Sequence, residues 1–396
     1  MNHLLSDRVV NMSTSATLAM AAKTRELKAE GKDVIGLSLG EPDFNIPDFI
    51  KEEAIQAIHD NYSSYTPVDG YADLKAAIIE KFKRDNNLTY TLPQVVVSTG
   101  AKQSLANVAM VLINPGDEVI LPAPYWVSYA DIVKISGGVP VEVPTSIDTD
   151  FKMTPEQLEA AITPKTKMLW YSSPCNPSGS VYSKEELEAL AAVLKKHPNI
   201  YVVSDEIYEH INFKGGHVSI AGIDGMYERT VTVNGVSKAF AMTGWRIGYI
   251  GAPDWIARAC NKIQGQITSG ANAIAQRATI AALKAPVSKI QFMIDEFHKR
   301  RDMVLELLKD IEGFKVNVPE GAFYVFPNIS YFFGKTLKGK TIENASDFAL
   351  YLLEEANVAT VTGEAFGNPA CIRISYAASE KELREAFKRI KKAVTV

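Results

Sequence analysis

The middle of the chain alternates short apolar runs, rich in β-branched residues, with segments whose apolar residues recur at helical spacing. Strands are predicted at residues 94–98, 118–121, 139–143, 167–171, 200–204 and 230–233. Helices are predicted at residues 101–112 and 183–194, and from about residues 128 and 154. The helix at 183–194 begins with a capping box, Ser183 followed by Glu186. Strands that alternate with helices predict an α/β fold with a mostly parallel sheet covered on both faces.

The pattern changes after about residue 285. A long helical pattern at 288–308 precedes short apolar runs at 322–326, 359–362 and 372–376, and an amphipathic helix follows at 380–393. This order predicts a smaller α+β domain, and 396 residues are enough for two domains. We predict a large domain at residues 46–285 and a small C-terminal domain at residues 286–396. Residues 1–45 would form an N-terminal arm and part of the small domain.

The composition is that of an ordinary globular protein, with 46% hydrophobic and 22% charged residues. A net charge of -4 gives no electrostatic case for a nucleic-acid partner. The cysteines, Cys175, Cys260 and Cys371, match neither a disulfide framework nor a zinc site, which suits a reducing cytoplasm. No apolar run is long enough to span a bilayer, and the first residues lack the pattern of a secretory signal. We therefore expect a cytoplasmic protein with no membrane anchor and no metal site.

Two residues with reactive side chains follow predicted strands, where ligands bind in α/β sheets of this kind. Asp205 directly follows the strand at 200–204, and Lys238 follows the strand at 230–233 through a short loop. Both have ordinary alternatives, because a carboxylate after a strand often caps a helix and a loop lysine is usually solvated. The small and apolar residues at 239–242, however, would desolvate the Lys238 amine, lower its pKa and make it nucleophilic.

Short motifs of one family occur in order along the chain, and each of them alone is a weak signal. They are LGEPD at 39–43, YTPVDG at 65–70, PYW at 124–126, NPSG at 176–179, SDEIY at 204–208, SKAFAMTGWRIG at 237–248 and RIS at 373–375. Together they resemble the fold-type-I aminotransferases that depend on pyridoxal phosphate (PLP), from about Ser13 to the final helix. Within that family the chain looks most like the bacterial aspartate aminotransferases, including those that also act on prephenate.

The resemblance implies a PLP-transferase fold of type I, with a large PLP-binding domain built on a mostly parallel seven-stranded sheet and a smaller α+β domain. Lys238 would hold the cofactor as a Schiff base and then move a proton between the substrate α-carbon and cofactor C4′. Asp205 would pair with the pyridine nitrogen and keep it protonated. Tyr208 and Asn176 would hydrogen-bond to the phenolic oxygen of the ring. Asn176 has an ordinary alternative, since Asn-Pro-Ser-Gly is a common turn sequence.

The resemblance also assigns residues to the cofactor phosphate. Gly100, Ala101 and Lys102 open a helix after a strand, so free backbone N–H groups and the helix dipole would meet an anion there. Arg246 would add a charge-assisted hydrogen bond, and Ser237 would add its hydroxyl. Many relatives carry a serine three residues before the lysine, but this chain has Gly235 there, which puts one phosphate hydroxyl in doubt.

Four further residues receive roles from the resemblance. Trp126 would stack on the pyridine ring, although a tryptophan at this position could also be an ordinary core residue. Arg373 would clamp the substrate α-carboxylate with two parallel hydrogen bonds, the alternative being an arginine on an exposed edge strand. Gly40 would let the backbone approach the substrate. Tyr65 would reach the cofactor phosphate of a neighbouring subunit, which implies a homodimer with shared active sites.

The substrates are expected to be amino acids and 2-oxo acids. Lys102 matches the lysine that the bacterial subgroup uses for a side-chain carboxylate, which favours aspartate with 2-oxoglutarate in a ping-pong reaction. Some relatives that accept prephenate carry a basic residue where this chain has Ser13, so prephenate is less favoured. Aromatic and alanine aminotransferases remain alternatives, as does a PLP-dependent β-lyase or an aminocyclopropane-carboxylate synthase on the same fold. A transcription regulator with an aminotransferase-like domain is not favoured, because the residues before Leu37 resemble an aminotransferase arm.

Overall fold

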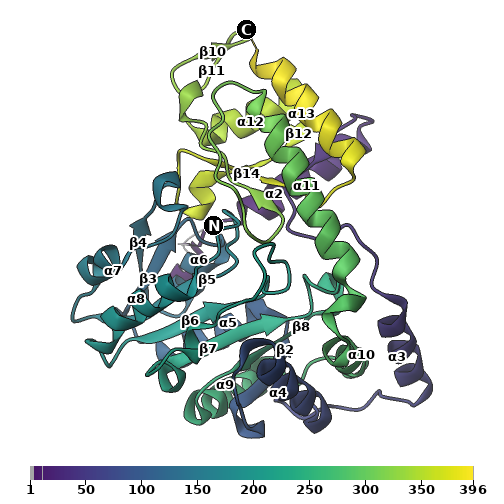
Figure 1. Cartoon of the computed structure of the whole chain (residues 1–396), viewed down its shortest axis with the longest axis vertical. Helices are drawn as coiled ribbons and strands as arrows, with labels where there is room; N and C mark the ends of the chain where they lie inside the picture. Colours follow the sequence, from purple (N-terminus) through teal and green to yellow (C-terminus); the bar gives the residue numbers. More distant parts are fainter. Residues whose placement is uncertain (1–3, 11, 396) are drawn as a thin grey trace.

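A seven-stranded mixed sheet forms the centre of the computed structural model, which describes residues 4–10 and 12–395. The strand order is β2-β8-β7-β6-β5-β3-β4 (Figure 1). All neighbours pair in parallel except β8, which is antiparallel to both β2 and β7. The strands are β2 (Val95–Thr99), β3 (Glu118–Ala123), β4 (Val139–Pro144), β5 (Thr166–Ser172), β6 (Tyr201–Asp205), β7 (Thr230–Gly235) and β8 (Ile247–Gly251). This arrangement confirms the prediction of a mostly parallel seven-stranded sheet.

Helices cover both faces of the sheet because successive side chains of a strand point to opposite sides. Val119 and Leu121 pack on one face against α5, α6 and α9, whereas Ile120 packs on the other face among residues of α7 and α8. Val95 and Val97 join that second face further along the sheet, where α3, α4 and α10 cover it. The helices are α3 (Asp48–His59), α4 (Ala72–Asn86), α5 (Ala101–Leu112), α6 (Ser128–Ile135), α7 (Pro155–Ala161), α8 (Lys184–Lys195), α9 (Asp254–Ile267) and α10 (Ala273–Lys284).

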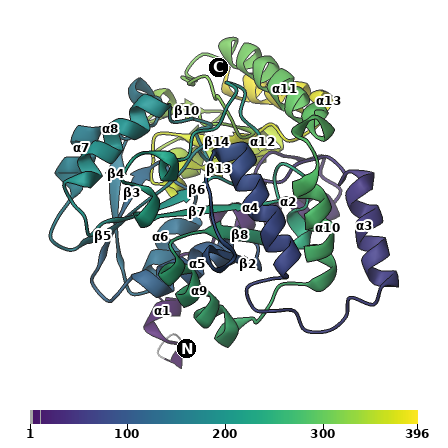
Figure 2. The same cartoon turned by 60° about the horizontal axis from the view of Figure 1, so that its bottom comes forward.

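The part of the chain after α10 builds most of a separate hydrophobic cluster, beside the sheet. It contains a three-stranded antiparallel sheet in the order β13-β14-β9 and the helices α11, α12 and α13. Figure 2 shows α11 and α13 side by side at one end of the molecule. The elements are β9 (Tyr324–Val325), β10 (Thr336–Leu337), β11 (Lys340–Thr341), β12 (Val358–Ala359), β13 (Val361–Thr362), β14 (Ile372–Ser375), α11 (Gln291–Lys309), α12 (Ala345–Ala356) and α13 (Glu380–Val394).

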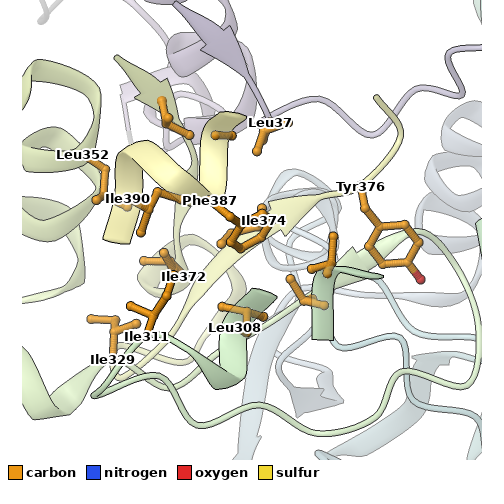
Figure 3. Close-up of a cluster of buried hydrophobic side chains, with 14 of the residues drawn as sticks. Leu37, Leu308, Ile311, Ile329, Leu352, Ile372, Ile374, Tyr376, Phe387 and Ile390 are labelled. Atoms are coloured by element: carbon orange, nitrogen blue, oxygen red, sulfur yellow. The ribbon is translucent and has the colours of Figure 1, made fainter. Parts of the chain in front are cut away.

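The start of the chain packs on this C-terminal region. After α1 (Asp7–Val10) and α2 (Ala16–Ala29), the short strand β1 (Ile35–Gly36) pairs in parallel with β12. Leu37 enters the same cluster as Ile374 of β14 and Phe387 of α13 (Figure 3). Leu37 thereby brings the loop at Gly40 next to β14, which carries Arg373. Among the residues that the structure describes, no helix combines the length and apolar character needed to cross a membrane.

The predicted elements match the observed ones closely in the central sheet, where the helix predicted at 101–112 coincides with α5 (Ala101–Leu112). Strand β8 was not predicted, because Gly248 and Gly251 interrupt its apolar pattern. The first of these glycines is required by a close approach: a Cβ at Gly248 would collide with the backbone of Ala101. The small strands are shorter than predicted, since only Tyr324–Val325 of residues 322–326 forms β9.

Candidate active site

A cavity of about 420 Å³ opens where β5 and β6 end and where the loops after β2, β3 and β7 begin. Parallel strands bring residues that are distant in sequence to one edge of the sheet, which explains the gathering of side chains there. The predicted site residues that line the cavity are Gly40, Ala101, Lys102, Trp126, Asn176, Asp205, Tyr208, Ser237, Lys238, Arg246 and Arg373. The fold therefore assembles nearly the whole predicted set in one place.

Lys238 places its amine in this cavity. Its Nζ donates a 2.5 Å hydrogen bond to the Gly40 carbonyl and lies 5.8 Å from the centre of the Tyr208 ring. Burial, followed by the positive charge of Arg373, lowers the pKa of Lys238 to about 8. The shift has the direction that the apolar neighbours at 239–242 predict. A larger share of this amine is neutral and nucleophilic near neutral pH than for a solvated lysine.

Asp205 ends β6 with a buried carboxylate. Its Oδ2 accepts a 2.7 Å hydrogen bond from the Tyr129 hydroxyl, and its Oδ1 accepts a 3.2 Å bond from the Ile207 backbone N–H. Burial raises the pKa of Asp205 to about 6, while these two hydrogen bonds oppose the rise. The carboxylate is therefore ionised at neutral pH and is suited to a cationic ring nitrogen in its vicinity.

Arg373 and Asn176 form a polar pair on the cavity wall. Arg373 is buried, and it donates from Nη1 to Asn176 Oδ1 at 2.9 Å and from Nη2 to the Ser38 carbonyl at 2.5 Å. Its Nε has no hydrogen-bond partner among the described residues. Because Oδ1 of Asn176 accepts from Arg373, the amide nitrogen of Asn176 can donate to another anion. The pair offers donors both for a carboxylate and for a phenolate.

The opposite part of the cavity carries an anion-binding arrangement. Gly100 is the N-cap of α5 and has φ 83°. Because the first N–H groups of any helix have no partner within it, those at the start of α5 can bind an anion. The Arg246 guanidinium packs so closely on Gly100 that a Cβ there would collide with it. Ser237 and Lys102 line the same cavity. Helix N–H groups, a guanidinium and a hydroxyl together form the donor set that a phosphate requires.

Lys102 and Trp126 lie next to each other on the cavity wall. The Lys102 Nζ is 4.8 Å from the centre of the Trp126 ring, a cation–π distance. Burial, and then the charge of Arg246, lowers the pKa of Lys102. Lys102 makes no ion pair among the described residues, so a ligand anion could provide its counter-charge.

The residues present fit PLP group by group. The site offers a carboxylate for the ring nitrogen, donors for the phenolic oxygen, the N-terminus of α5 with Arg246 for the phosphate, and the Lys238 amine for the carbonyl carbon. Ser172 supports this fit independently. Ser172 lines the cavity, and its buried hydroxyl has no hydrogen-bond partner of good geometry among the described residues, which leaves it available to a polar ligand atom.

Tyr65 is the predicted site residue that lies apart. Its side chain is 100% exposed, and it does not line the cavity of its own chain. Ser13 does not line the cavity, although Ser15 does, and its hydroxyl donates a 2.5 Å hydrogen bond to Asp131. A single chain therefore contains every predicted site residue except Tyr65 in or directly behind the cavity wall.

Sequence reasoning missed several residues of the site. Tyr129 and Tyr324 both line the cavity, as do Ser15, Thr17 and Leu18 from the start of the chain. Tyr129 lies in the first turn of α6, three residues after Trp126, which precedes the helix, so no shared helix face linked the two in the sequence. Tyr324 lies within an apolar run, where an aromatic residue is expected to belong to the core, so no local sequence pattern predicted it as a site residue.

Comparisons with known proteins give one family. Residues 32–390 match the family described as aminotransferase class I and II. Over 389 residues the chain is 50% identical to the aspartate/prephenate aminotransferase of Cereibacter sphaeroides, covering 98% of this chain and 97% of that relative.

Solved structures give the same result. The aspartate aminotransferase from Rhizobium meliloti superimposes with a TM-score of 0.95 at 46% identity, over 98% of each chain. The aspartate aminotransferase from Thermus thermophilus with maleate superimposes with a TM-score of 0.93 at 42% identity, over 98% of this chain and 99% of that one.

Proposed function

Since this chain belongs to the aminotransferase class I and II family, whose members depend on PLP, we propose that it transfers the amino group of L-aspartate to 2-oxoglutarate. The products are oxaloacetate and L-glutamate, and the reaction is ping-pong. The observation that carries the proposal is the convergence of the Lys238 amine, the Asp205 carboxylate and the Arg373 guanidinium on one cavity.

Each of these residues has a task in that reaction. PLP, when bound, supplies an electron sink that makes the α-hydrogen of an amino acid acidic. Lys238, with its lowered pKa, would take the proton from the substrate α-carbon and deliver it to the cofactor. Asp205 would keep the ring nitrogen protonated, and Arg373 would orient the substrate through its α-carboxylate. Closure of residues 286–396 over the cavity excludes water during these steps.

Dicarboxylate specificity rests on Lys102. Its ammonium group lies in the cavity beside Trp126 and makes no ion pair among the described residues, so it can pair with a second carboxylate of the substrate. The similar Thermus thermophilus protein was solved with maleate, which is a dicarboxylate. Two relatives, from Pinus pinaster and Rhizobium meliloti, carry aspartate aminotransferase as their name. Lys102 is therefore the residue that we assign to the side-chain carboxylate of aspartate.

Prephenate is a second candidate substrate, because a relative 50% identical to this chain is an aspartate/prephenate aminotransferase. The absence of a basic residue at Ser13 argues in the other direction. The hydroxyl of Ser13 donates to the carboxylate of Asp131, so this position offers no cation to a bulky dicarboxylate. We therefore rank prephenate below aspartate.

The quaternary state and location complete the proposal. A homodimer would bring Tyr65, fully exposed in one chain, to the cofactor phosphate of the partner. The three cysteines are free and buried, as in proteins of a reducing compartment, and we assign the protein to the cytoplasm. Residues 46–285 form the PLP-binding domain in this proposal, and residues 286–396 with part of 1–45 form the small domain.

The test is a visible spectrum of the purified protein followed by a two-substrate assay. A pH-sensitive absorbance from bound PLP and fast exchange between aspartate and 2-oxoglutarate are expected. Tyrosine, alanine and prephenate, each with its amino partner, rank the alternatives. Turnover that needs no 2-oxo acid would identify a β-lyase instead. A protein that gains no chromophore even after PLP is added would contradict the proposal.

A further inference from the structure

A second tyrosine stands behind the tyrosine assigned to the cofactor. The hydroxyl oxygens of Tyr208 and Tyr324 are 2.6 Å apart, and both side chains are buried. Tyr208 lies in the loop after β6, whereas Tyr324 lies on β9, in the C-terminal region. The hydrogen bond thus joins the two parts of the chain that enclose the cavity.

Tyr324 also touches the groups assigned to the substrate. The Arg373 guanidinium lies 4.6 Å from the centre of the Tyr324 ring, a cation–π contact in a desolvated setting. Gly40 leaves room for the hydroxyl, because a Cβ at that position would collide with Tyr324 Oη. The hydroxyl therefore occupies a defined place between the Gly40 loop and Tyr208.

The number of available protons constrains what this pair can do. Each phenol has one hydrogen to donate, and burial raises the pKa of both tyrosines, so both stay protonated at neutral pH. If Tyr208 donated to Tyr324, it would have no proton left for a cofactor oxygen. If Tyr324 donates to Tyr208, the Tyr208 proton remains available.

We infer that Tyr324 is a positioning residue of the proposed reaction, whose hydroxyl donates to Tyr208 and directs the Tyr208 proton to the phenolic oxygen of PLP. Through its ring, Tyr324 links the arginine that binds the substrate carboxylate to the tyrosine that binds the cofactor. This inference rests on the proposed function, because it assigns PLP to the cavity.

The charges around the pair favour this direction of donation. The positive charge of Arg373 over the Tyr324 ring opposes the rise that burial causes in the pKa of Tyr324, and this makes its O–H the stronger donor. The charge of Arg373 also opposes the rise in the pKa of Tyr208, but there the carboxylate of Asp205 adds to the rise that burial causes. Donation from Tyr324 also polarises the Tyr208 hydroxyl and strengthens its own hydrogen bond.

The experiment is a pH titration of the visible absorbance of the bound cofactor in the wild-type holoenzyme and in Tyr324→Phe. A hydrogen bond to the phenolic oxygen lowers the pKa at which this absorbance changes. Loss of the Tyr324 donor should therefore raise the midpoint by about 0.5 to 1 pH unit, the effect of one hydrogen bond. A midpoint that stays unchanged or falls would overturn the inference, since a fall means that Tyr208 was the donor.

Tyr351→Phe is the matched control. Its hydroxyl is buried in the same C-terminal cluster but donates to the Ala393 carbonyl at 2.6 Å, away from the cavity. The midpoint of this variant should equal that of the wild type. If Tyr324→Phe does not fold, Gly40→Ala displaces the Tyr324 hydroxyl without removing it and should raise the midpoint too. A Gly40→Ala midpoint at or below the wild-type value would overturn the inference.

Maleate tests the link to Arg373. Binding of this unreactive dicarboxylate should move the wild-type midpoint, and the shift in Tyr324→Phe should be at least about twofold smaller. Equal shifts would show that the tyrosine does not transmit substrate binding.

A wild-type protein without a PLP chromophore would refute the proposed function itself, whereas a normal wild-type titration with an unshifted variant refutes only the role of Tyr324.

Discussion

The hydroxyl of Tyr129 donates a 2.7 Å hydrogen bond to Oδ2 of Asp205, and both side chains are buried. Tyr129 lies in the first turn of α6, so the helix after β3 supports the residue that ends β6. Burial raises the pKa of Asp205, and the Tyr129 bond opposes that rise. The tyrosine therefore helps to keep a buried carboxylate ionised, which is the state that a protonated pyridine nitrogen requires.

Replacing Tyr129 with phenylalanine should lower kcat/KM for aspartate by about tenfold or more, because a hydrogen bond to a charged group contributes about 1.5–3 kcal/mol. Steady-state kinetics give this number. Tyr125→Phe is the matched control, since the Tyr125 hydroxyl binds Glu142 instead and its loss should leave the rate nearly unchanged. Equal effects of the two substitutions would show that the Asp205 contact has no special role.

Lys238→Ala should abolish transamination while leaving the fold intact, because Lys102, the other lysine that lines the cavity among the described residues, is assigned to the side-chain carboxylate and not to the α-carbon. The assay is exchange between aspartate and 2-oxoglutarate, with circular dichroism to check the fold. Lys262→Ala, at an exposed position on α9, should behave like the wild type. Substantial residual turnover in Lys238→Ala would remove this lysine from the mechanism.

The covalent capture of PLP by the apoenzyme should become faster as the pH rises through about 8. The neutral amine of Lys238 is the nucleophile, and burial with the charge of Arg373 lowers the pKa of this group to about 8. The rate should therefore be small at pH 6 and level off above pH 9. Stopped-flow absorbance after removal and re-addition of PLP measures it. A rate that keeps rising to pH 10 would indicate an ordinary, solvated lysine.

Lys102→Met and Arg373→Lys should separate the two carboxylate sites. Loss of Lys102 should reduce kcat/KM for aspartate by about 10- to 100-fold and leave alanine nearly unaffected, because only aspartate has a second carboxylate. Arg373→Lys should reduce the values for both amino acids, since lysine cannot form the paired hydrogen bonds of a guanidinium. Comparison of the two substrates in the same variant is the internal control. A Lys102 variant that loses alanine activity equally would contradict the assignment.

A buried ion pair behind the Tyr208 loop contributes to stability. Glu209 contacts the Lys81 ammonium, and Asn86 bridges the two by accepting from Lys81 at 2.7 Å and donating to Glu209 at 2.8 Å. Burial alone would raise the pKa of Glu209, but the Lys81 charge, with smaller contributions from neighbouring histidines, lowers it to about 2. The folded pKa is below the unfolded one, so this stabilisation is present at neutral pH and is lost as the pH falls from about 4 to about 2.

Lys81→Met should lower the free energy of unfolding by about 3–5 kcal/mol at pH 7, because it leaves a buried carboxylate without a counter-charge. The double variant Lys81→Met with Glu209→Leu should recover much of that loss, since it removes the stranded charge. Urea unfolding at pH 7 measures both. A double variant as unstable as the single one would mean that packing, and not charge, accounts for the effect.

The sequence by itself determined the local elements and the chemistry of the site. The alternation of apolar residues predicted α5 and most strands of the sheet, because periods of two and 3.6 residues depend only on neighbours in the chain. The motifs around Asp205 and Lys238 predicted both the family and the cofactor. The apolar residues after Lys238 also predicted the direction of its pKa shift.

Only the tertiary structure decided which distant residues meet. The antiparallel insertion of β8, the pairing of β1 with β12 and the contact of Tyr324 with Tyr208 all join segments that no local pattern connects. An apolar run predicts that a residue is buried but does not identify the residues that it contacts. From the sequence, Tyr324 was therefore indistinguishable from a core residue and Tyr129 from an ordinary helix residue. The roles of the two hydroxyls become visible only in the folded chain, where Tyr324 contacts Tyr208 and Tyr129 donates to Asp205.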